Sequence, residues 1–349
     1  MSERSTPRAL VMLLVAASAV VVLAGIKAVN TILGPIVLAL VLVVAVAPIR
    51  GWLVRRRAPS WLVVAVPFSV VIVVLLGMVA ILTTAVVQMA ALLPGYSGQF
   101  NKLVADAQAW AAARGIAPQV NQALRSFDPG KMVGIAQSLV SSVLGVVSSL
   151  FLIVVLLLAM SLDAPVTSRI IAAAAAERPA ITKALTTFAD RTRRYLLVST
   201  IFGLICAALD VVALYVLSVP LPLLWGVLAL ITNYIPNIGF VIGLVPPALL
   251  ALLTGGLRSM ILVIVAYMVI NIVVQSFIQP KFLGDAVGLS TTVTFLSLIL
   301  WATVLGPLGA LLAIPLTLLT RALFIDSDPG LKWSTALVSG ELPANRPGS

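Results

Sequence analysis

The 349-residue chain is too apolar for a water-soluble fold, since 61% of its residues are hydrophobic and only 9% are charged, against about a quarter charged in an ordinary soluble domain. A single cysteine, Cys206, and the absence of histidine exclude intrachain disulfides, paired Cys or His metal sites and His-based catalysis. The net charge of +11 does not indicate nucleic acid binding, because the basic residues stand beside apolar runs without interleaved aromatic residues. We therefore expect no cofactor, metal, nucleic acid partner or enzyme activity.

Eight apolar runs are long enough to cross a hydrocarbon core of about 30 Å. They cover residues 10–26, 29–49, 61–88, 137–160, 195–218, 222–253, 258–278 and 289–323. The sequence predicts an all-α integral membrane protein of about eight transmembrane helices in a lipid bilayer. Broken or re-entrant helices are expected in the C-terminal half, and amphipathic helices outside the bilayer.

The basic residues predict the orientation of the chain. An even number of crossings puts both termini on one side, and with that side inside, 16 of the 22 basic residues fall in inner segments, Arg258 among them. The positive-inside rule favours this arrangement. We therefore expect both termini to be cytoplasmic.

Two stretches between the runs follow helical spacing outside the hydrocarbon. Residues 99–112 predict an external amphipathic helix, which either packs on the protein or lies on the membrane or against another subunit. Residues 165–193 predict an internal amphipathic region, with a helix end and cap at Asp163 before it. The expected regions are 1–90 (helices 1–3), 91–136 (external), 137–194 (helix 4 and internal region), 195–325 (helices 5–8, the transport core) and 326–349 (a flexible cytoplasmic tail).

The run 222–253 is the most informative, because its 32 residues would form a helix of about 48 Å, too long for one simple crossing. Pro236 removes a backbone donor in its middle, so the helix should tilt strongly, break or re-enter. Freed backbone groups at membrane depth need protein or water as partners. A substrate path is one interpretation and a structural kink repaired by asparagines is the other; the residues concerned are Asn233, Tyr234, Pro236, Asn237 and Gly239.

Asp210 is the one acidic residue deep inside an apolar run. A carboxylate there is costly unless it faces a wet cavity, is protonated or has a partner. It is our candidate for ion coupling or gating. The alternative is a protonated side chain that hydrogen-bonds a neighbouring helix.

Three amides, Asn271, Gln275 and Gln279, are spaced four residues apart in the seventh run. Side chains at this spacing share a helix face, so they form a polar stripe that either lines a path or bonds another helix. Helix breaks are expected at Pro280 and, in the last run, at Gly306, Pro307, Gly309 and Pro315.

At these same residues the chain resembles the autoinducer-2 exporter (AI-2E) family of bacterial transporters. The resemblance rests on residues 233–239, on Gly243, Pro246, Pro247, Gly255 and Gly256, on Gln279-Pro280-Lys281 with Gly284, on Gly288-Leu289-Ser290, and on Gly306 through Pro315. The chain departs from the family in two places, because Gln279 stands where many members carry an acidic residue and Asp210 is an addition. Ion coupling therefore cannot be copied from a relative.

The resemblance implies eight transmembrane helices in a bacterial inner (plasma) membrane, homo-oligomeric assembly and export of small molecules of the autoinducer-2 type used in quorum sensing. Some similar proteins act as sodium or proton antiporters, so a monovalent cation/proton antiporter is the alternative. A non-transporting membrane scaffold is the second alternative, and it would pair its amides between helices in a dry interior.

Overall fold

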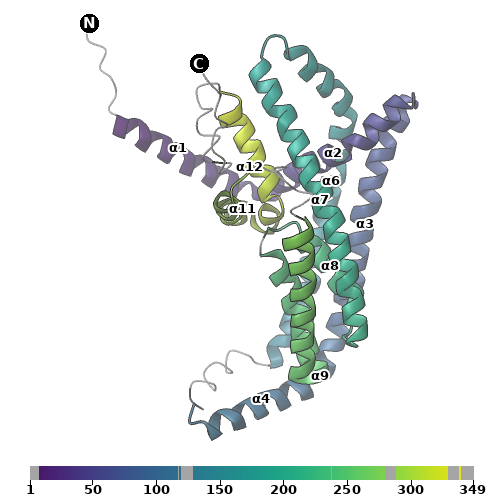
Figure 1. Ribbon diagram of the computed structural model, residues 1–349, viewed down its shortest axis with the longest axis vertical. Helices are drawn as coiled ribbons and strands as arrows, with labels where there is room; N and C mark the ends of the chain where they lie inside the picture. Colours follow the sequence, from purple (N-terminus) through teal and green to yellow (C-terminus); the bar gives the residue numbers. More distant parts are fainter. Residues whose placement is uncertain are drawn as a thin grey trace. The chain divides into compact units, whose positions relative to one another are not determined.

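The structure is a computed structural model that describes residues 8–116, 118, 129–236, 238–279, 288–328 and 338. Every regular element in these ranges is a helix, which confirms the all-α class (Figure 1). The elements are α1 (Arg8–Ala28), α2 (Asn30–Arg55), α3 (Ser60–Leu92), η1 (Leu93–Tyr96), α4 (Ser97–Ala113), α6 (Pro129–Ala174), α7 (Pro179–Val216), α8 (Pro222–Thr232), α9 (Gly239–Asn271), the π-helix η2 (Ile272–Ile278), α11 (Thr291–Leu311), α12 (Ala313–Arg321) and a second π-helix, η4 (Ala322–Asp326).

Six helices of the described chain are long and apolar enough to cross a membrane. They lie at Asn30–Arg55, Ser60–Met89, Leu150–Ala174, Pro179–Val216, Gly239–Gln275 and Thr291–Leu311. Two shorter apolar helices, Ala17–Ala28 and Pro222–Thr232, accompany them. The chain is therefore a multi-pass membrane protein.

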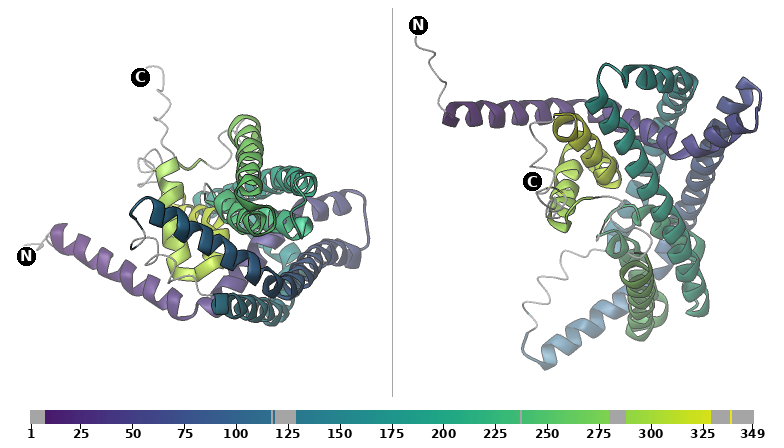
Figure 2. Two further views of the ribbon diagram at one scale, coloured as in Figure 1. Left: turned by 90° about the horizontal axis from the view of Figure 1, so that it is seen from below. Right: turned by 45° about the horizontal axis from the view of Figure 1, so that its top comes forward.

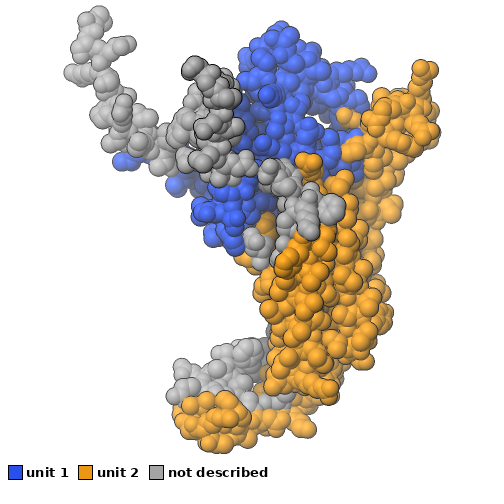
Figure 3. Space-filling view, viewed as in Figure 1, with its two compact units in different colours: residues 1–47, 155–193, 285–349 blue, residues 48–154, 194–284 orange. Residues whose placement is uncertain are grey.

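The helices form two compact units (Figure 3). Unit 1 comprises Met1–Ala47, Val155–Arg193 and Asp285–Ser349, and unit 2 comprises Pro48–Val154 and Arg194–Gly284. The long helices α6 and α7 each contribute to both units. The candidate site lies entirely in unit 2.

The predicted interruption of the run 222–253 is confirmed, because α8 ends at Thr232 and α9 begins at Gly239. The two helices are antiparallel neighbours. A Cβ atom on Gly243 would lie 3.0 Å from the Thr232 hydroxyl, and one on Gly239 would overlap the Thr232 carbonyl oxygen. Leu224, at the start of α8, and Ala251, three turns into α9, belong to one buried cluster. The run is therefore a re-entrant hairpin whose tip lies between Thr232 and Gly239.

A second turn follows within α9, where Gly256 takes a non-helical backbone conformation with φ of 71°. A side chain at this φ is strained, so the glycine permits the chain to turn there. Met260, just beyond the turn, packs on the same buried cluster as Met89 and Tyr96, near the end of α3. The eight-crossing alternation placed Arg258 on the opposite side of the membrane from the end of α3. That placement is wrong, because the re-entrant hairpin returns the chain to the side from which it entered.

One further expectation is corrected in α6. The helix end predicted at Asp163 is absent, since α6 continues through Asp163 and Pro165 to Ala174. A proline removes only one backbone donor, and the carbonyl that loses it can be satisfied by water where the helix leaves the bilayer. The internal region 165–193 is divided between two helices, since α6 ends at Ala174 and α7 begins at Pro179.

In unit 1, the predicted break of the last run occurs at Gly306, which has φ of 67° and precedes Pro307. Beyond it the chain folds back, so that a Cβ on Gly309 would overlap the Trp301 carbonyl oxygen and the Trp301 indole donates a 3.0 Å hydrogen bond to the Thr317 hydroxyl. Gly309 and Pro315 are themselves helical, which corrects their assignment as breaks. Gly309 instead permits a close backbone approach, and Pro315 stands in the first turn of α12, where its missing donor is not needed. Pro280 lies outside the described residues.

We predict that Gly239→Ala destabilises the hairpin, because the added methyl group would overlap the Thr232 carbonyl. Overpacking of this kind costs about 1–3 kcal/mol. The apparent unfolding temperature of the detergent-solubilised protein would fall. The control is Gly77→Ala on α3, where a Cβ meets nothing within 4 Å. Equal unfolding temperatures for the two variants would contradict the close approach.

Candidate functional site

The tip of the hairpin is held against α7 by hydrogen bonds from both sides. The Tyr195 hydroxyl donates to the Tyr234 carbonyl at 2.8 Å, and the Tyr234 hydroxyl shares a 2.6 Å hydrogen bond with Thr200. The Asn233 amide donates to the Ser199 carbonyl at 2.9 Å. The polar groups that the break exposes therefore find partners in protein, as hydrocarbon surroundings require.

Asn233 can approach α7 this closely because residue 203 is glycine. A Cβ on Gly203 would lie 2.9 Å from the Asn233 amide nitrogen and 3.1 Å from a methyl carbon of Leu230. A side chain at this position would displace the Asn233 amide. Gly203 thus positions Asn233, although it belongs to a different helix.

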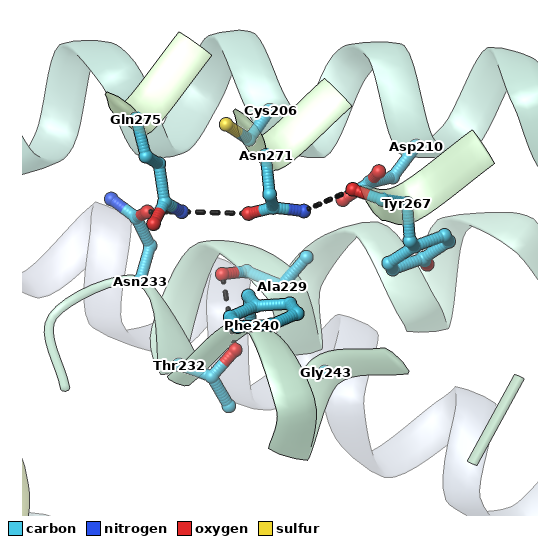
Figure 4. A pocket seen from close by; sticks show the side chains of 10 residues that line it. All are labelled: Cys206, Asp210, Ala229, Thr232, Asn233, Phe240, Gly243, Tyr267, Asn271 and Gln275. Atoms are coloured by element: carbon cyan, nitrogen blue, oxygen red, sulfur yellow. Dashed lines mark hydrogen bonds between the residues drawn. The ribbon is translucent and has the colours of Figure 1, made fainter. Parts of the chain in front are cut away.

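A chain of amides joins the tip to the polar stripe on α9 and η2 (Figure 4). The Gln275 amide donates to the side-chain oxygen of Asn233 at 2.8 Å and to that of Asn271 at 2.7 Å. The Asn271 amide in turn donates to the Tyr267 carbonyl, four residues earlier, at 2.8 Å. Gln275 lies within the π-helix η2, an irregularity that is frequent at functional sites. The amide stripe therefore hydrogen-bonds the tip of the hairpin and also lines a cavity.

The cavity lies beside this amide chain, between α7, the hairpin and the second leg of α9. Its lining residues are Cys206, Asp210, Ala229, Thr232, Asn233, Phe240, Gly243, Tyr267, Asn271 and Gln275 (Figure 4). Its volume, measured as the space open to the centre of a water molecule, is about 10 Å³. That is roughly the space needed by one water.

Among the described residues, two buried side chains that line this cavity each have a polar atom without a hydrogen-bond partner. These atoms are one carboxyl oxygen of Asp210, whose residue is 1% exposed, and the hydroxyl oxygen of Tyr267, also 1% exposed. No basic side chain is among the ten lining residues. Buried polar groups are normally satisfied, so these two atoms can accept a polar ligand, a proton or a cation.

The structure brings four of the predicted site residues together, namely Asp210, Asn233, Asn271 and Gln275. Tyr234, Pro236, Gly239 and Gln279 do not line the cavity: Tyr234 instead bonds α7, and Gly239 serves the close contact with α8. Asn237 lies outside the described residues. In the part of the chain that is described, no cluster of acidic, Cys or His side chains could hold a metal ion.

Sequence reasoning missed Tyr267, Cys206 and Gly203. The first two had a signal, because Tyr267 precedes Asn271 by four residues and Cys206 precedes Asp210 by four, and side chains at that spacing share a helix face. Gly203 had none, since its role depends on Asn233, which is thirty residues away in the chain.

A multi-pass helical bundle whose re-entrant hairpin places polar groups at membrane depth has the construction of a secondary transporter. The chain belongs to the AI-2E family of membrane transporters, whose family model matches residues 15–327. The resemblance noted in the sequence is thereby confirmed.

Relatives in several bacteria align with most of the chain. The AI-2 transport protein TqsA of Escherichia coli is 31% identical over 306 residues, which are 86% of this chain and 88% of TqsA. The putative transport protein YhhT of Escherichia coli is 29% identical over 340 residues, or 96% of each chain. A putative transport protein of Haemophilus influenzae is 28% identical over 319 residues, or 90% of this chain and 91% of the relative.

We predict that Tyr195→Phe weakens the attachment of the tip to α7, because the Tyr234 carbonyl loses its donor. Loss of a hydrogen bond with a buried partner costs about 1–3 kcal/mol. The apparent unfolding temperature should fall. Tyr215→Phe is the matched control, since Tyr215 is 61% exposed on the same helix; a fall of equal size in both variants would disprove the assignment.

Proposed function

We propose that the protein exports small polar molecules of the autoinducer-2 type, through a route that opens at the cavity beside the hairpin tip. The proposal rests on one observation: a group of amide and carboxyl side chains converges on this cavity at membrane depth. Amides present donors and acceptors without net charge, which suits a neutral, hydroxyl-rich solute. The relative named an AI-2 transport protein supports this choice of solute.

The cavity as it stands has space for about one water, so the solute requires an open form of the site. The contact that must part is the one between Gln275 and Asn233, because within the described residues their hydrogen bond ties the tip to the amide stripe. In the open form, these two amides would bond the solute instead of each other. Opening therefore exchanges one set of hydrogen bonds for another, at little net cost.

A scaffold without transport would also pair amides between helices, as Gln275 and Asn233 do. It would have no reason to leave a carboxyl oxygen and a phenol hydroxyl unpaired at one cavity. Unpaired buried groups cost stability and persist where function uses them. This difference favours transport. We further propose that the protein lies in the bacterial inner membrane with both termini in the cytoplasm.

We predict that Asn233→Ala and Gln275→Ala each reduce export of the solute from loaded proteoliposomes at least several-fold, because each removes a side chain that the open site would use. Gln88→Ala on α3 is the matched control, since this amide is exposed and does not line the cavity. The measurement is the initial efflux rate at equal protein content. Undiminished efflux in both site variants would remove these amides from the route.

A monovalent cation/proton antiporter is the second candidate, and the unpaired carboxyl oxygen of Asp210 favours it. A lone carboxylate in the membrane can carry a proton or a sodium or lithium ion in alternation. The two candidates differ in one measurable respect. In an antiporter, sodium or lithium alone drives proton movement, whereas an exporter without ion coupling moves no protons when the cation is added.

We predict that, if Asp210 couples ions, sodium or lithium added to acid-loaded proteoliposomes releases protons in the wild type and not in Asp210→Asn. A pH-sensitive dye inside the vesicles reports this. Asp106→Asn, which alters an exposed carboxylate on α4, should behave as the wild type. A silent dye in the wild type, together with normal solute efflux, would exclude antiport and keep the exporter.

A further inference from the structure

The turn between α2 and α3 carries a compact group of basic and aromatic side chains. It comprises residues 56–59, belongs to unit 2 and projects at the edge of that unit (Figures 2 and 3). Both helices that it joins are long and apolar enough to cross a membrane. The 26 residues of α2 extend about 39 Å, which exceeds the thickness of the hydrocarbon. The turn therefore emerges at the level of the phospholipid headgroups.

Three consecutive arginines stand at this turn, and all three are exposed. Arg55 is the last residue of α2, and Arg56 and Arg57 follow it. Among the described residues, no acidic side chain forms an ion pair within 4 Å with any of the three. The sequence from residue 4 to residue 105 contains no acidic residue either. The turn therefore presents three positive charges that the neighbouring chain does not neutralise.

Two exposed tryptophans flank the arginines. Trp52, one turn before the end of α2, is 51% exposed, and Trp61, at the start of α3, is 67% exposed. The Arg56 guanidinium lies over the Trp52 ring, 5.3 Å from its centre. Tryptophan rings gather at the headgroup level of a bilayer, where one part of the ring contacts acyl chains and its N–H contacts polar groups. The exposure of both rings leaves them free to make these contacts.

Arg57 occupies a backbone position that suits glycine better. The Arg57 N–H donates to the Val54 carbonyl at 3.0 Å and the Ala58 N–H donates to the Leu53 carbonyl at 3.0 Å, which is the Schellman pattern of a helix C-terminus. Arg57 is the left-handed residue of this pattern, with φ of 54°. A side chain strains that conformation, and glycine is the usual residue there. The presence of arginine indicates that its charge serves something other than the turn.

We propose that the α2–α3 turn is a binding site for anionic phospholipids. The guanidinium groups of Arg55, Arg56 and Arg57 bind the phosphate oxygens with paired donors, and Trp52 and Trp61 lie against the upper acyl chains. Basic clusters beside a membrane helix attract anionic lipid. Orientation by the positive-inside rule needs only charge, and it accounts for neither the exposed rings nor the strained arginine. The proposal holds whichever solute is carried.

The test compares two brominated lipids as quenchers of tryptophan fluorescence in proteoliposomes of the full chain. Phosphatidylcholine vesicles contain the same small fraction of either brominated phosphatidylglycerol or brominated phosphatidylcholine. The emission of the two rings is the difference between the wild type and Trp52→Phe/Trp61→Phe. We expect the anionic lipid to quench this emission several-fold more than the neutral one, because the arginines concentrate it there. Equal quenching by the two lipids would overturn the proposal, as would weak quenching by both, which would mean that protein covers the turn.

Arg56→Gln has a matched control in Arg114→Gln. The Arg114 guanidinium also lies over a tryptophan four residues earlier, 4.1 Å from the centre of the Trp110 ring, but no arginine stands beside it in the sequence. Each variant loses one positive charge and one stacked pair. We expect the preference for anionic lipid to fall in Arg56→Gln and to keep its wild-type size in Arg114→Gln. An equal fall in both would reveal a general effect of charge and count against the site.

Arg57→Gly separates the fold of the turn from its binding of lipid. Glycine relieves the left-handed residue, so the unfolding temperature in neutral detergent should rise. The preference for anionic lipid should fall in the same variant, because one of the three guanidinium groups is lost. A lipid preference that stays at the wild-type level would remove Arg57 from the site, whatever the unfolding temperature.

Discussion

The structure depends on a single constraint: a backbone that breaks inside hydrocarbon must find hydrogen-bond partners within the protein. The break between α8 and α9 meets it through α7, whose Tyr195, Ser199 and Thr200 bond the residues of the tip. The price is a close approach that only glycine at 203 permits. The Tyr195 hydroxyl satisfies the Tyr234 carbonyl, and the Asn233 bond to the Ser199 carbonyl holds Asn233 beside Gln275.

The cavity beside the tip is lined by polar groups that are only partly paired among the described residues. Around it the amides of Asn233, Asn271 and Gln275 bond one another or a carbonyl, while Asp210 and Tyr267 each keep an unpaired oxygen. A protein under no functional demand would gain stability by replacing these two groups with apolar ones. The chain belongs to a transporter family, and transport is the functional demand that the proposed route assigns to these two groups.

The sequence predicted the interruption at Pro236, the kink at Gly306 and the amphipathic α4, because proline, glycine and helical periodicity act locally. It could not distinguish crossing from re-entry, since an apolar run has the same hydropathy whichever way its second half turns. Arg258 was misplaced for this reason. The contact between Gly203 and Asn233 was equally hidden, because it joins two helices. A sequence pattern therefore predicts where a helix breaks. Which helix packs against the broken segment depends on tertiary packing, which the pattern does not contain.

The re-entrant hairpin makes the two sides of the cavity unequal within unit 2. Toward the end that carries η1 and the Gly256 turn, α8 and the first leg of α9 form a double wall, and the 11 residues of α8 alone extend about 16 Å. Toward the opposite end, the loop 233–238 is the whole of the hairpin. A thin barrier can open by local rearrangement of a few residues, whereas a thick one has to move as a body. The hairpin therefore gives the cavity one thin side, which a local change can open, and one thick side, which opens only when whole helices move.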